Sequence, residues 1–536
     1  MTSYCSLLYL AVFLPVVVLV HRILPQRLRW AALLAASYAF FWSVSGKLLV
    51  FLILSTVSIH HFGLWLDAEQ QCRNGRLAAA APADRKKIRQ RFTRRLRAIL
   101  FLAVLVQAGT LLTLKYAAFF SVNLNHLLDA LRLPLAVPVP SFLLPIGISF
   151  YTLQAISYLI DVYRGTVRAD RNLARLMLFL GFFPQIMEGP ICRYGQTAQQ
   201  LWEGRPVTWQ GLTFGMQRIL YGLIKKIVIA DRLNLLIKTV FNDYTTFSGS
   251  IIALATVCYT CQLYMDFSGT MDVVLGSAEI FGVHLPENFR QPFFSRSISE
   301  FWQRWHISLG AWFKDYVFYP LSMSGPLKKL TGAARRRLGN HYGPLVSGSI
   351  ALGVVWFFNG LWHGAGWHYL FFGFYHFALI LAGSLFEPVF KRVTDFLHID
   401  RACLPYRVMQ TVRTALLVCV GELFFRANGL RAGLAMFRTM VTDFSLEAFT
   451  NGGFLSLGMD KYDFAVTLVA VGLVFVVGLL RERGVRLRET VACRPVAVRW
   501  PVYYAAFLFL VIFGAYGVGY VPVDPIYAAF KEVRLP

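Results

Sequence analysis

The chain has 536 residues, of which 57% are apolar and 15% are charged, and its formal net charge is +25. Soluble domains carry about 25% charged residues, so this composition excludes a disordered chain, a fibrous repeat and an ordinary soluble enzyme. The basic residues stand in short blocks between apolar stretches, which predicts an all-α, multi-pass membrane protein with its basic loops in the cytoplasm. No nucleic-acid-binding motif accompanies this charge, so nucleic acid is not expected as a partner.

Apolar runs recur along the whole chain and predict about 11–13 transmembrane helices. They cover residues 5–21, 29–45, 48–66, 98–120, 142–163, 173–190, 210–240, 248–267, 344–362, 367–386, 410–425, 463–480 and 501–519. The first run has no basic segment before it and no cleavage site, so we expect a retained span with an external N-terminus. The basic loop 67–97 then lies in the cytoplasm, as the positive-inside rule requires. Basic blocks at 328–337 and 481–499 are expected there too.

Eight cysteines are scattered along the chain and predict no disulfide framework. The one close pair, Cys258 and Cys261, lies in an apolar run. A redox or metal role is conceivable for such a pair, but small apolar filler is the commoner role of cysteine there. No metal site is predicted.

Polar residues share one helical face in residues 143–164. Tyr151, Gln154, Tyr158 and Asp161 follow one another at spacings of three, four and three, which places them on the same side of a helix. Because lipid does not tolerate such a face, it must point into the helix bundle. Two interpretations remain equally open, a cavity wall and hydrogen bonding between helices.

A second polar face follows in residues 259–272, where Tyr259, Gln262 and Asp266 lie on one side. We expect Ser268 and Gly269 to break this helix. An acidic residue inside a membrane marks a functional site by default. The alternative is a structural ion pair of Asp266, for example with Arg304 or Lys314.

Residues 297–320 are charged throughout and are too polar for an ordinary span. An apolar stripe runs along one side at helical spacing, and Glu300, Arg304 and Ser308 lie on another; the stripe consists of Phe301, Trp305, Leu309, Trp312 and Tyr316. This pattern predicts a single interfacial or re-entrant amphipathic helix. His306 lies within it, and a lone histidine in such a place is usually a packing residue.

Residues 343–366 are uncharged and apolar until Asn359 and His363, which stand four residues apart on one face. We expect the helix to end at the Gly364–Gly366 segment. A histidine in apolar surroundings stays neutral and basic, and a neighbouring polar group can fix its tautomer. The sequence therefore offers His363 as a general base, with a buried structural histidine as the alternative.

Five motifs in order resemble the membrane-bound O-acyltransferase (MBOAT) family, and specifically its bacterial alginate O-acetylase-like branch. They are LPIGISFYTLQAISYLIDVYRG (144–165), FFPQIMEGPICRY (182–194), MDFSGTMDVVLGSAEIFGVHLPENFRQPF (265–293), FWQRWHISLGAWFKDYVFYPL (301–321) and NGLWHGAGWHYLFFGFYH (359–376). The resemblance implies one polytopic domain over 1–536, with its catalytic core in 140–380. It also implies a helix bundle around a central funnel.

The resemblance further implies transfer of an acyl group from a thioester to a hydroxyl. His363 matches the family's catalytic histidine and His306 its second active-site position; Asn359, Asp266 and Arg304 are weaker candidates for polar support. No bound cofactor is expected, and the donor would be acetyl-CoA or an acyl-carrier thioester. The expected location is the bacterial cytoplasmic membrane, with an extracytoplasmic acetyltransferase or polysaccharide-assembly partner.

Two alternatives to acetyl transfer onto an extracytoplasmic polysaccharide remain. The same fold could transfer D-alanyl groups to teichoic acid. A protein of another class, a transporter or flippase without acyl chemistry, would also have many spans and buried charges. The histidines separate these classes, because an acyltransferase needs His363 whereas a transporter would tolerate its replacement.

Overall fold

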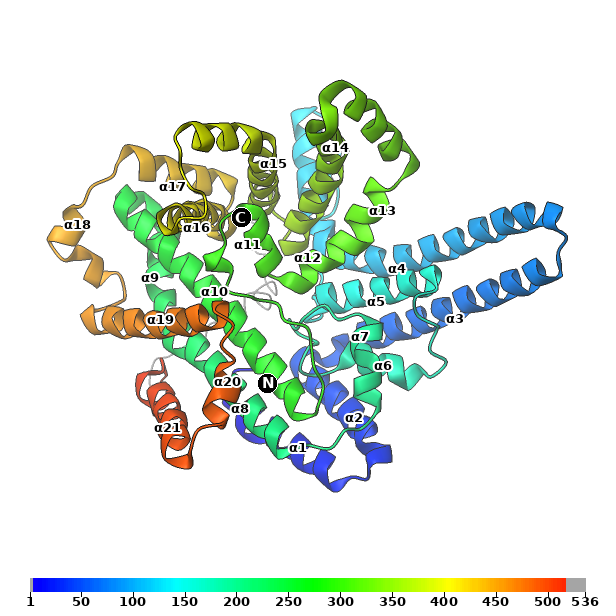
Figure 1. Ribbon diagram of the computed structural model, residues 1–536, viewed down its shortest axis with the longest axis horizontal. Helices are drawn as coiled ribbons and strands as arrows, with labels where there is room; N and C mark the ends of the chain where they lie inside the picture. The colour runs from blue at the N-terminus through cyan, green and yellow to red at the C-terminus, as the bar shows by residue number, and fades with distance from the viewer. Residues whose placement is uncertain (1–2, 517–536) are drawn as a thin grey trace. The chain divides into compact units, whose positions relative to one another are not determined.

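The computed structural model describes residues 3–516, and in this range its regular elements are all helical (Figure 1). Within residues 3–516, eight helical segments are long and apolar enough to cross a membrane: Gln26–Ala79, Pro82–Ala130, Gly249–Ile280, Gly325–His363, Trp367–Phe396, Leu404–Arg426, Lys461–Glu482 and Val496–Phe513. A shorter apolar helix covers Leu8–Ile23. The predicted all-α polytopic fold is confirmed. Residues 517–519 of the last predicted span lie outside the described range.

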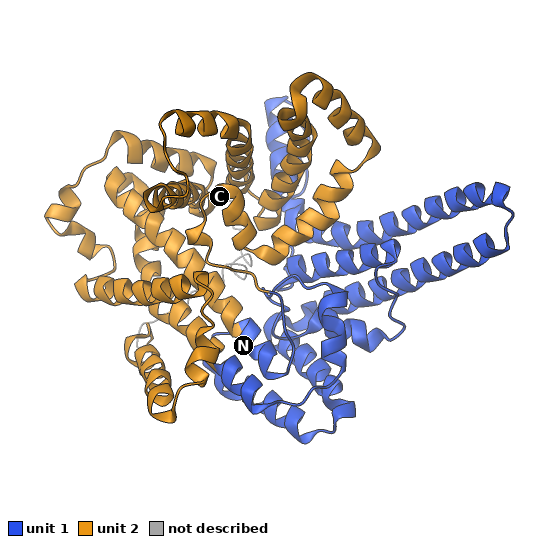
Figure 2. Cartoon of the chain, in the orientation of Figure 1, with its two compact units in different colours: residues 1–216, 274–286, 527–536 blue, residues 217–273, 287–526 orange. Residues whose placement is uncertain are grey.

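The chain forms two compact units (Figure 2). Among the described residues, the first unit contains 3–216 and 274–286, and the second contains 217–273 and 287–516. The helices of the first unit are α1 (Leu14–Ile23), α2 (Gln26–Ser45), α3 (Leu49–Ala79), α4 (Pro82–Ala130), α5 (Ile148–Arg164), α6 (Leu173–Gly181) and α7 (Tyr194–Trp202).

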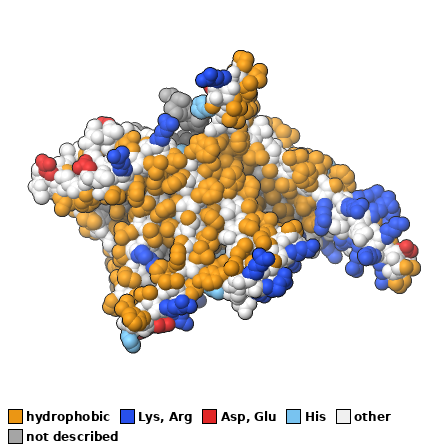
Figure 3. Space-filling view, turned by 90° about the horizontal axis from the view of Figure 1, so that it is seen from above, with side chains coloured by type: hydrophobic (Ala, Val, Ile, Leu, Met, Phe, Trp, Pro, Cys, Tyr) orange, Lys and Arg blue, Asp and Glu red, His pale blue; other side chains and the backbone are white. Residues whose placement is uncertain are grey.

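Residues 67–97, predicted as a loop, are helical and join α3 to α4 in a long hairpin (Figure 1). Only residues 80 and 81 separate the two helices, because Pro82 begins α4 at a position that suits proline. The segment is rich in Ala, Arg, Lys and Gln, which are strong helix formers. Phe92 is buried inside the hairpin beneath the guanidinium of Arg76. Lys and Arg side chains gather along the outer part of this hairpin (Figure 3).

Two residues on the polar face of α5 form hydrogen bonds within the first unit. The Gln154 side-chain amide donates to the carbonyl of Pro190 at 3.3 Å, and the Tyr158 hydroxyl accepts from the Asp170 backbone N–H at 2.9 Å. Asp161 lies at the half-buried end of this face. These contacts support the hydrogen-bonding interpretation for Gln154 and Tyr158, whereas the buried Tyr151 hydroxyl has no hydrogen-bond partner within residues 3–516.

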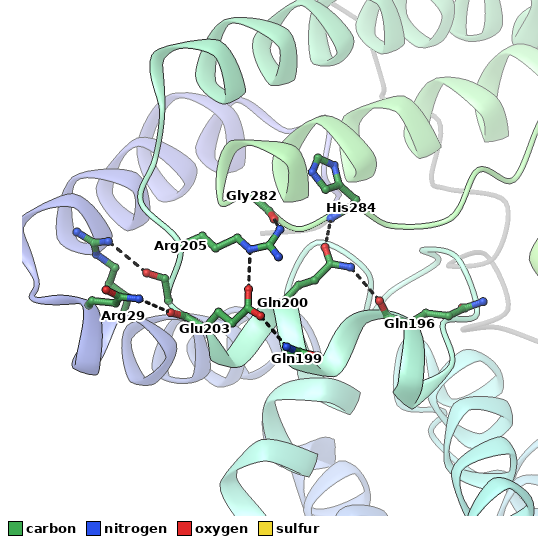
Figure 4. A network of polar contacts seen from close by, with 10 residues as sticks. Arg29, Gln196, Gln199, Gln200, Glu203, Arg205, Gly282 and His284 are labelled. Atoms are coloured by element: carbon green, nitrogen blue, oxygen red, sulfur yellow. Dashed lines mark hydrogen bonds and ion pairs between the residues drawn. The ribbon is translucent and has the colours of Figure 1, made fainter. Parts of the chain in front are cut away.

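A polar network after α7 joins separate segments of the first unit (Figure 4). Arg205 binds the Glu203 carboxylate at 2.8 Å and the Gly282 carbonyl at 3.3 Å. The first of these contacts holds the pKa of Glu203 below its ordinary value. The Gln200 side chain accepts from the backbone N–H of His284 at 2.8 Å. The network therefore fixes residues 282–284 beside α7.

The second unit begins at residue 217, within α8 (Trp209–Leu223), and continues through a π-helical segment, Ile224–Ala230, into α9 (Asp231–Asn242). It also contains residues 249–273 of α10 (Gly249–Ile280). Its other helices are α11 (Ile298–Arg304), α12 (Ile307–Phe313), α13 (Tyr319–Ser322), α14 (Gly325–His363), α15 (Trp367–Phe396), α16 (Leu404–Arg426), α17 (Leu430–Thr442), α18 (Glu447–Thr450), α19 (Lys461–Glu482), α20 (Leu487–Ala492) and α21 (Val496–Phe513).

The predicted break at Ser268 and Gly269 is wrong, because α10 continues through both residues. Gly269 instead allows close packing against α8. A Cβ atom at Gly269 would lie 2.8 Å from the carbonyl oxygen of Gly222. Small residues allow such backbone approach between membrane helices.

Glycines also bring α14 and α15 together beside His363. A Cβ at Gly360 would lie 2.5 Å from the Tyr369 carbonyl oxygen, and one at Gly373 would lie 2.5 Å from the Trp356 carbonyl oxygen. Since both obstacles are backbone atoms, an added methyl group must push the two helices apart. His363 ends α14, so this spacing also sets its position.

We expect Gly373→Ala to lower stability by about 1–3 kcal/mol, the usual cost of overpacking. Thermal unfolding in detergent would measure this effect. The matched control is Gly383→Ala on the same helix, where nothing lies within 4 Å of the new methyl group. Equal behaviour of both variants would refute the close-packing argument.

Candidate active site

His363 is the last residue of α14, and the helix ends there as predicted. Its side chain is 4% exposed. The imidazole meets three aromatic rings edge to face, with ring centroids 5.0 Å from Trp362, 5.9 Å from Phe372 on α15 and 5.1 Å from Phe425 on α16. Three helices thus surround this histidine with apolar rings.

His306 lies at a break in the chain, where the sequence predicted one continuous helix. Helix α11 ends at Arg304, Trp305 forms an isolated antiparallel bridge with Phe289, and α12 begins at Ile307. His306 has φ +46° and ψ +50°, which is left-handed backbone. That conformation is uncommon for residues other than glycine and clusters at functional sites. The predicted interfacial helix is therefore two short helices, with Trp305 and Trp312 buried.

The two histidines meet at one aromatic residue. Trp362 lies 5.5 Å from the His306 ring and 5.0 Å from the His363 ring, measured between centroids. His306 is 2% exposed, and its ring centroid also lies 4.9 Å from that of Phe267 on α10. Residues 57 positions apart in the sequence thus share one buried aromatic environment.

Asn288 holds the turn at His306, and sequence reasoning missed it. Its backbone carbonyl accepts from the N–H of Ile307 at 3.0 Å. Its side-chain oxygen accepts from the N–H of Ser308 at 3.0 Å, and its amide nitrogen lies 3.3 Å from the sulfur of Met271. Asn288 therefore satisfies the first two N–H groups of α12, which helix ends leave without internal partners.

Asn288→Ala should lower the transfer rate about tenfold, the effect of losing one buried hydrogen bond, because the His306 turn then loses its side-chain support. Asn288→Asp keeps an acceptor oxygen at the start of α12 and should restore much of the rate. A kcat measurement on both variants, with thermal unfolding followed in parallel, tests this positioning role. Equal rates for the Ala and Asp variants would contradict it.

Asp266 forms an ion pair, but with Lys226 instead of Arg304 or Lys314. The Lys226 ammonium lies 2.8 Å from Asp266 and 2.9 Å from Asp231. All three side chains are at most 3% exposed. The structural interpretation of Asp266 is thus supported, although Asp266 adjoins Phe267, which contacts His306.

The other two candidates for polar support of the histidines are Arg304 and Asn359. Arg304 binds Glu300 at 2.7 Å and Glu482 at 2.9 Å, so its guanidinium is engaged in ion pairs. Asn359 lies one helical turn before His363 and is 7% exposed. Its side-chain oxygen has no hydrogen-bond partner within residues 3–516.

Two further buried groups near His363 were not predicted. His376 is fully buried, with ring centroids 4.9 Å from Trp302, 5.6 Å from Trp356 and 4.7 Å from Phe372. Glu422, three residues before Phe425, is 2% exposed, and one of its carboxyl oxygens has no partner among the described residues. A lone histidine or glutamate in an apolar run gives no periodic signal that could reveal this.

Comparisons with known proteins show which family the chain resembles. Residues 167–333 match MBOAT, the membrane-bound O-acyltransferase family. The chain is 33% identical over 475 residues to a probable alginate O-acetylase of Azotobacter vinelandii, covering 87% of this chain and 84% of the relative. It is 28% identical to a peptidoglycan O-acetyltransferase of Helicobacter pylori, covering 64% of each chain.

A teichoic acid D-alanyltransferase of Bacillus subtilis is 29% identical over 252 residues, which cover 46% of this chain and 60% of the relative. The named relatives are acyltransferases that act on different polymers. The class of chemistry is thus shared, and a transporter without acyl chemistry loses support. The chain is an acyltransferase and belongs to the membrane-bound O-acyltransferase family.

Proposed function

We propose that this acyltransferase moves an acetyl group from a thioester donor toward hydroxyl groups of a polysaccharide outside the bacterial cytoplasmic membrane. The observation that carries the proposal is the pair of buried histidines in contact with Trp362. Likeness to an alginate O-acetylase over most of the chain supports acetyl as the acyl group and a polysaccharide as the acceptor.

In this proposal His363 is the general base. Its imidazole takes the hydroxyl proton while the hydroxyl oxygen attacks the thioester carbonyl carbon. The carbon–sulfur bond then breaks, and the thiolate receives the proton from the imidazolium. Thioester and alcohol become ester and thiol, so atoms and charge balance without another reactant.

His306 is the proposed hydrogen-bond donor to the developing oxyanion, or the group that orients the attacking hydroxyl. A donor fixed in advance is effective because no reorganisation is needed during the reaction. The left-handed turn held by Asn288 supplies such fixation. Phe267, Phe372 and Phe425 surround the histidines with apolar rings, where electrostatic interactions are stronger than in water.

The proposed donor is acetyl-CoA or an acyl-carrier thioester that arrives from the cytoplasm. The protein itself holds no cofactor in this scheme. A separate extracytoplasmic acetyltransferase or polysaccharide-assembly protein would complete the transfer to the polymer.

Ester analysis of the cell's extracytoplasmic polymers tests the proposal. We expect acetyl esters, measured by NMR on purified polysaccharide, to disappear on deletion and to return with the wild-type gene but not with His363→Ala. Loss of D-alanyl esters would instead support the teichoic acid alternative. Unchanged esters of both kinds would overturn the proposal.

A further inference from the structure

A groove in the second unit is lined by arginines from three separate segments. It has a volume of about 410 Å³ and lies among α8, the segment after α10, and the end of α19 with α20. This is within the usual range of about 300–1,000 Å³ for small-molecule sites. We call it the arginine groove after its lining residues Arg218, Arg290, Arg481, Arg486 and Arg488.

The groove has more arginines than carboxylates along its wall. Glu287 and Glu489 are the acidic residues that line the groove. Glu287 binds Arg218 at 2.6 Å, and Glu489 lies 3.7 Å from Arg486. Arg290 and Arg481 have no carboxylate within 4 Å among residues 3–516. The groove therefore has an excess of guanidinium groups, which attract anions and bind phosphate through paired N–H donors.

The inner end of the groove adjoins a polar cavity of about 40 Å³, large enough for water. Lys225 lies there, 2.5 Å from Asp272 and 2.9 Å from the Ser268 hydroxyl. Its ammonium and the Arg481 guanidinium both lie over the ring of Tyr221, at 4.9 and 5.0 Å from the centroid. These contacts hold Arg481 at the boundary between cavity and groove.

The wall of this cavity also supports His306. Asn288 and Phe289 line the cavity. Asn288 fixes the two residues after His306. Phe289 lies 5.0 Å from Phe267, the ring that contacts His306 at 4.9 Å. One layer of side chains thus separates the arginine groove from the candidate active site.

We propose that the arginine groove binds the phosphate group of a ligand. Such a phosphate has two chemical sources. One is the nucleotide or pantetheine phosphate of the thioester donor, and this source rests on the proposed function. The other is the headgroup of an anionic phospholipid, which needs no acyl transfer. Both require Arg481 and Arg486.

Binding measurements on the full-length protein in nanodiscs of zwitterionic lipid test this site. Radiolabelled coenzyme A without an acyl group is the first probe, so binding does not depend on turnover. Native mass spectrometry with phosphatidylglycerol is the second. The test variant is Arg481→Gln with Arg486→Gln. The control is Arg483→Gln with Arg494→Gln, which removes the same charge from exposed residues that do not line the groove.

We expect the test variant to weaken one probe at least tenfold, while the control changes binding less than threefold. Loss of coenzyme A binding identifies the donor as the source, and loss of phosphatidylglycerol binding alone identifies the lipid headgroup. Equal binding of both probes by test and control variants overturns the site. Coenzyme A binding that requires Arg481 could be observed even if the protein transferred no acetyl group. A failure of the arginine groove and a failure of the acetyl-transfer proposal can therefore be told apart.

Discussion

Replacement of His363 by Gln is expected to lower the acyl-transfer rate by a factor of roughly 10²–10⁴, the usual contribution of a general base. This corresponds to about 3–5.5 kcal/mol of transition-state stabilisation at 1.36 kcal/mol per tenfold change. Gln fills a similar volume and keeps hydrogen-bonding groups between Trp362 and Phe425, but it cannot accept the proton. Release of free thiol from acetyl-CoA by protein in nanodiscs, with an acceptor present, measures the rate.

The matched variant is His376→Gln, which changes a second buried histidine on the neighbouring helix. If His363 is catalytic and His376 is not, the His376→Gln variant should keep more than a tenth of the wild-type acyl-transfer rate. Thermal unfolding of both variants shows whether either loses its fold. Wild-type turnover by folded His363→Gln would refute its role as the base.

Replacement of Lys226 by Met should destabilise the second unit by about 3–5 kcal/mol, the typical result of removing one partner of a buried ion pair. Asp231 and Asp266 would then remain as two buried carboxylates without their shared cation. Thermal unfolding of the detergent-solubilised protein measures the loss. Lys238→Met, which changes an exposed lysine on α9, should leave the unfolding temperature nearly unchanged.

The triple variant Lys226→Met, Asp231→Asn, Asp266→Asn removes all three charges and should recover much of the lost stability, since apolar or neutral replacements of whole buried ion clusters are often tolerated. A triple variant less stable than Lys226→Met would show that the carboxylates have another role. That outcome would return Asp266 to the list of functional candidates.

Local patterns in the sequence predicted much of the fold. Apolar runs located the long helices, and the glycines after His363 correctly predicted where α14 ends. Charge alone wrongly predicts a loop over residues 67–97, because the Ala, Lys and Arg content of this segment favours a helix. A segment that is too polar to span a membrane can therefore still form a helix.

The site itself depends on contacts between distant residues, which periodicity does not reveal. The apolar stripe continued unbroken through His306, yet the chain turns there because Asn288 binds the following N–H groups. Lys226 pairs with Asp266, which lies 40 positions later in the sequence. Lys226 belongs to a π-helical segment, where side chains do not follow the spacing of an α-helix. Family resemblance marked both histidines, but only the fold shows that Trp362 contacts them both.

Photo-crosslinking from the acyl end of the donor tests most directly whether chemistry occurs at this histidine pair. An acyl-CoA analogue with a short diazirine-bearing acyl chain would be irradiated with the wild-type protein in nanodiscs, and labelled peptides would be mapped by mass spectrometry. We predict label on Trp362, Phe267 or Phe425, and its loss when excess acetyl-CoA is added. Competable label confined to the α3–α4 hairpin or another part of the first unit would contradict the assignment of the active site.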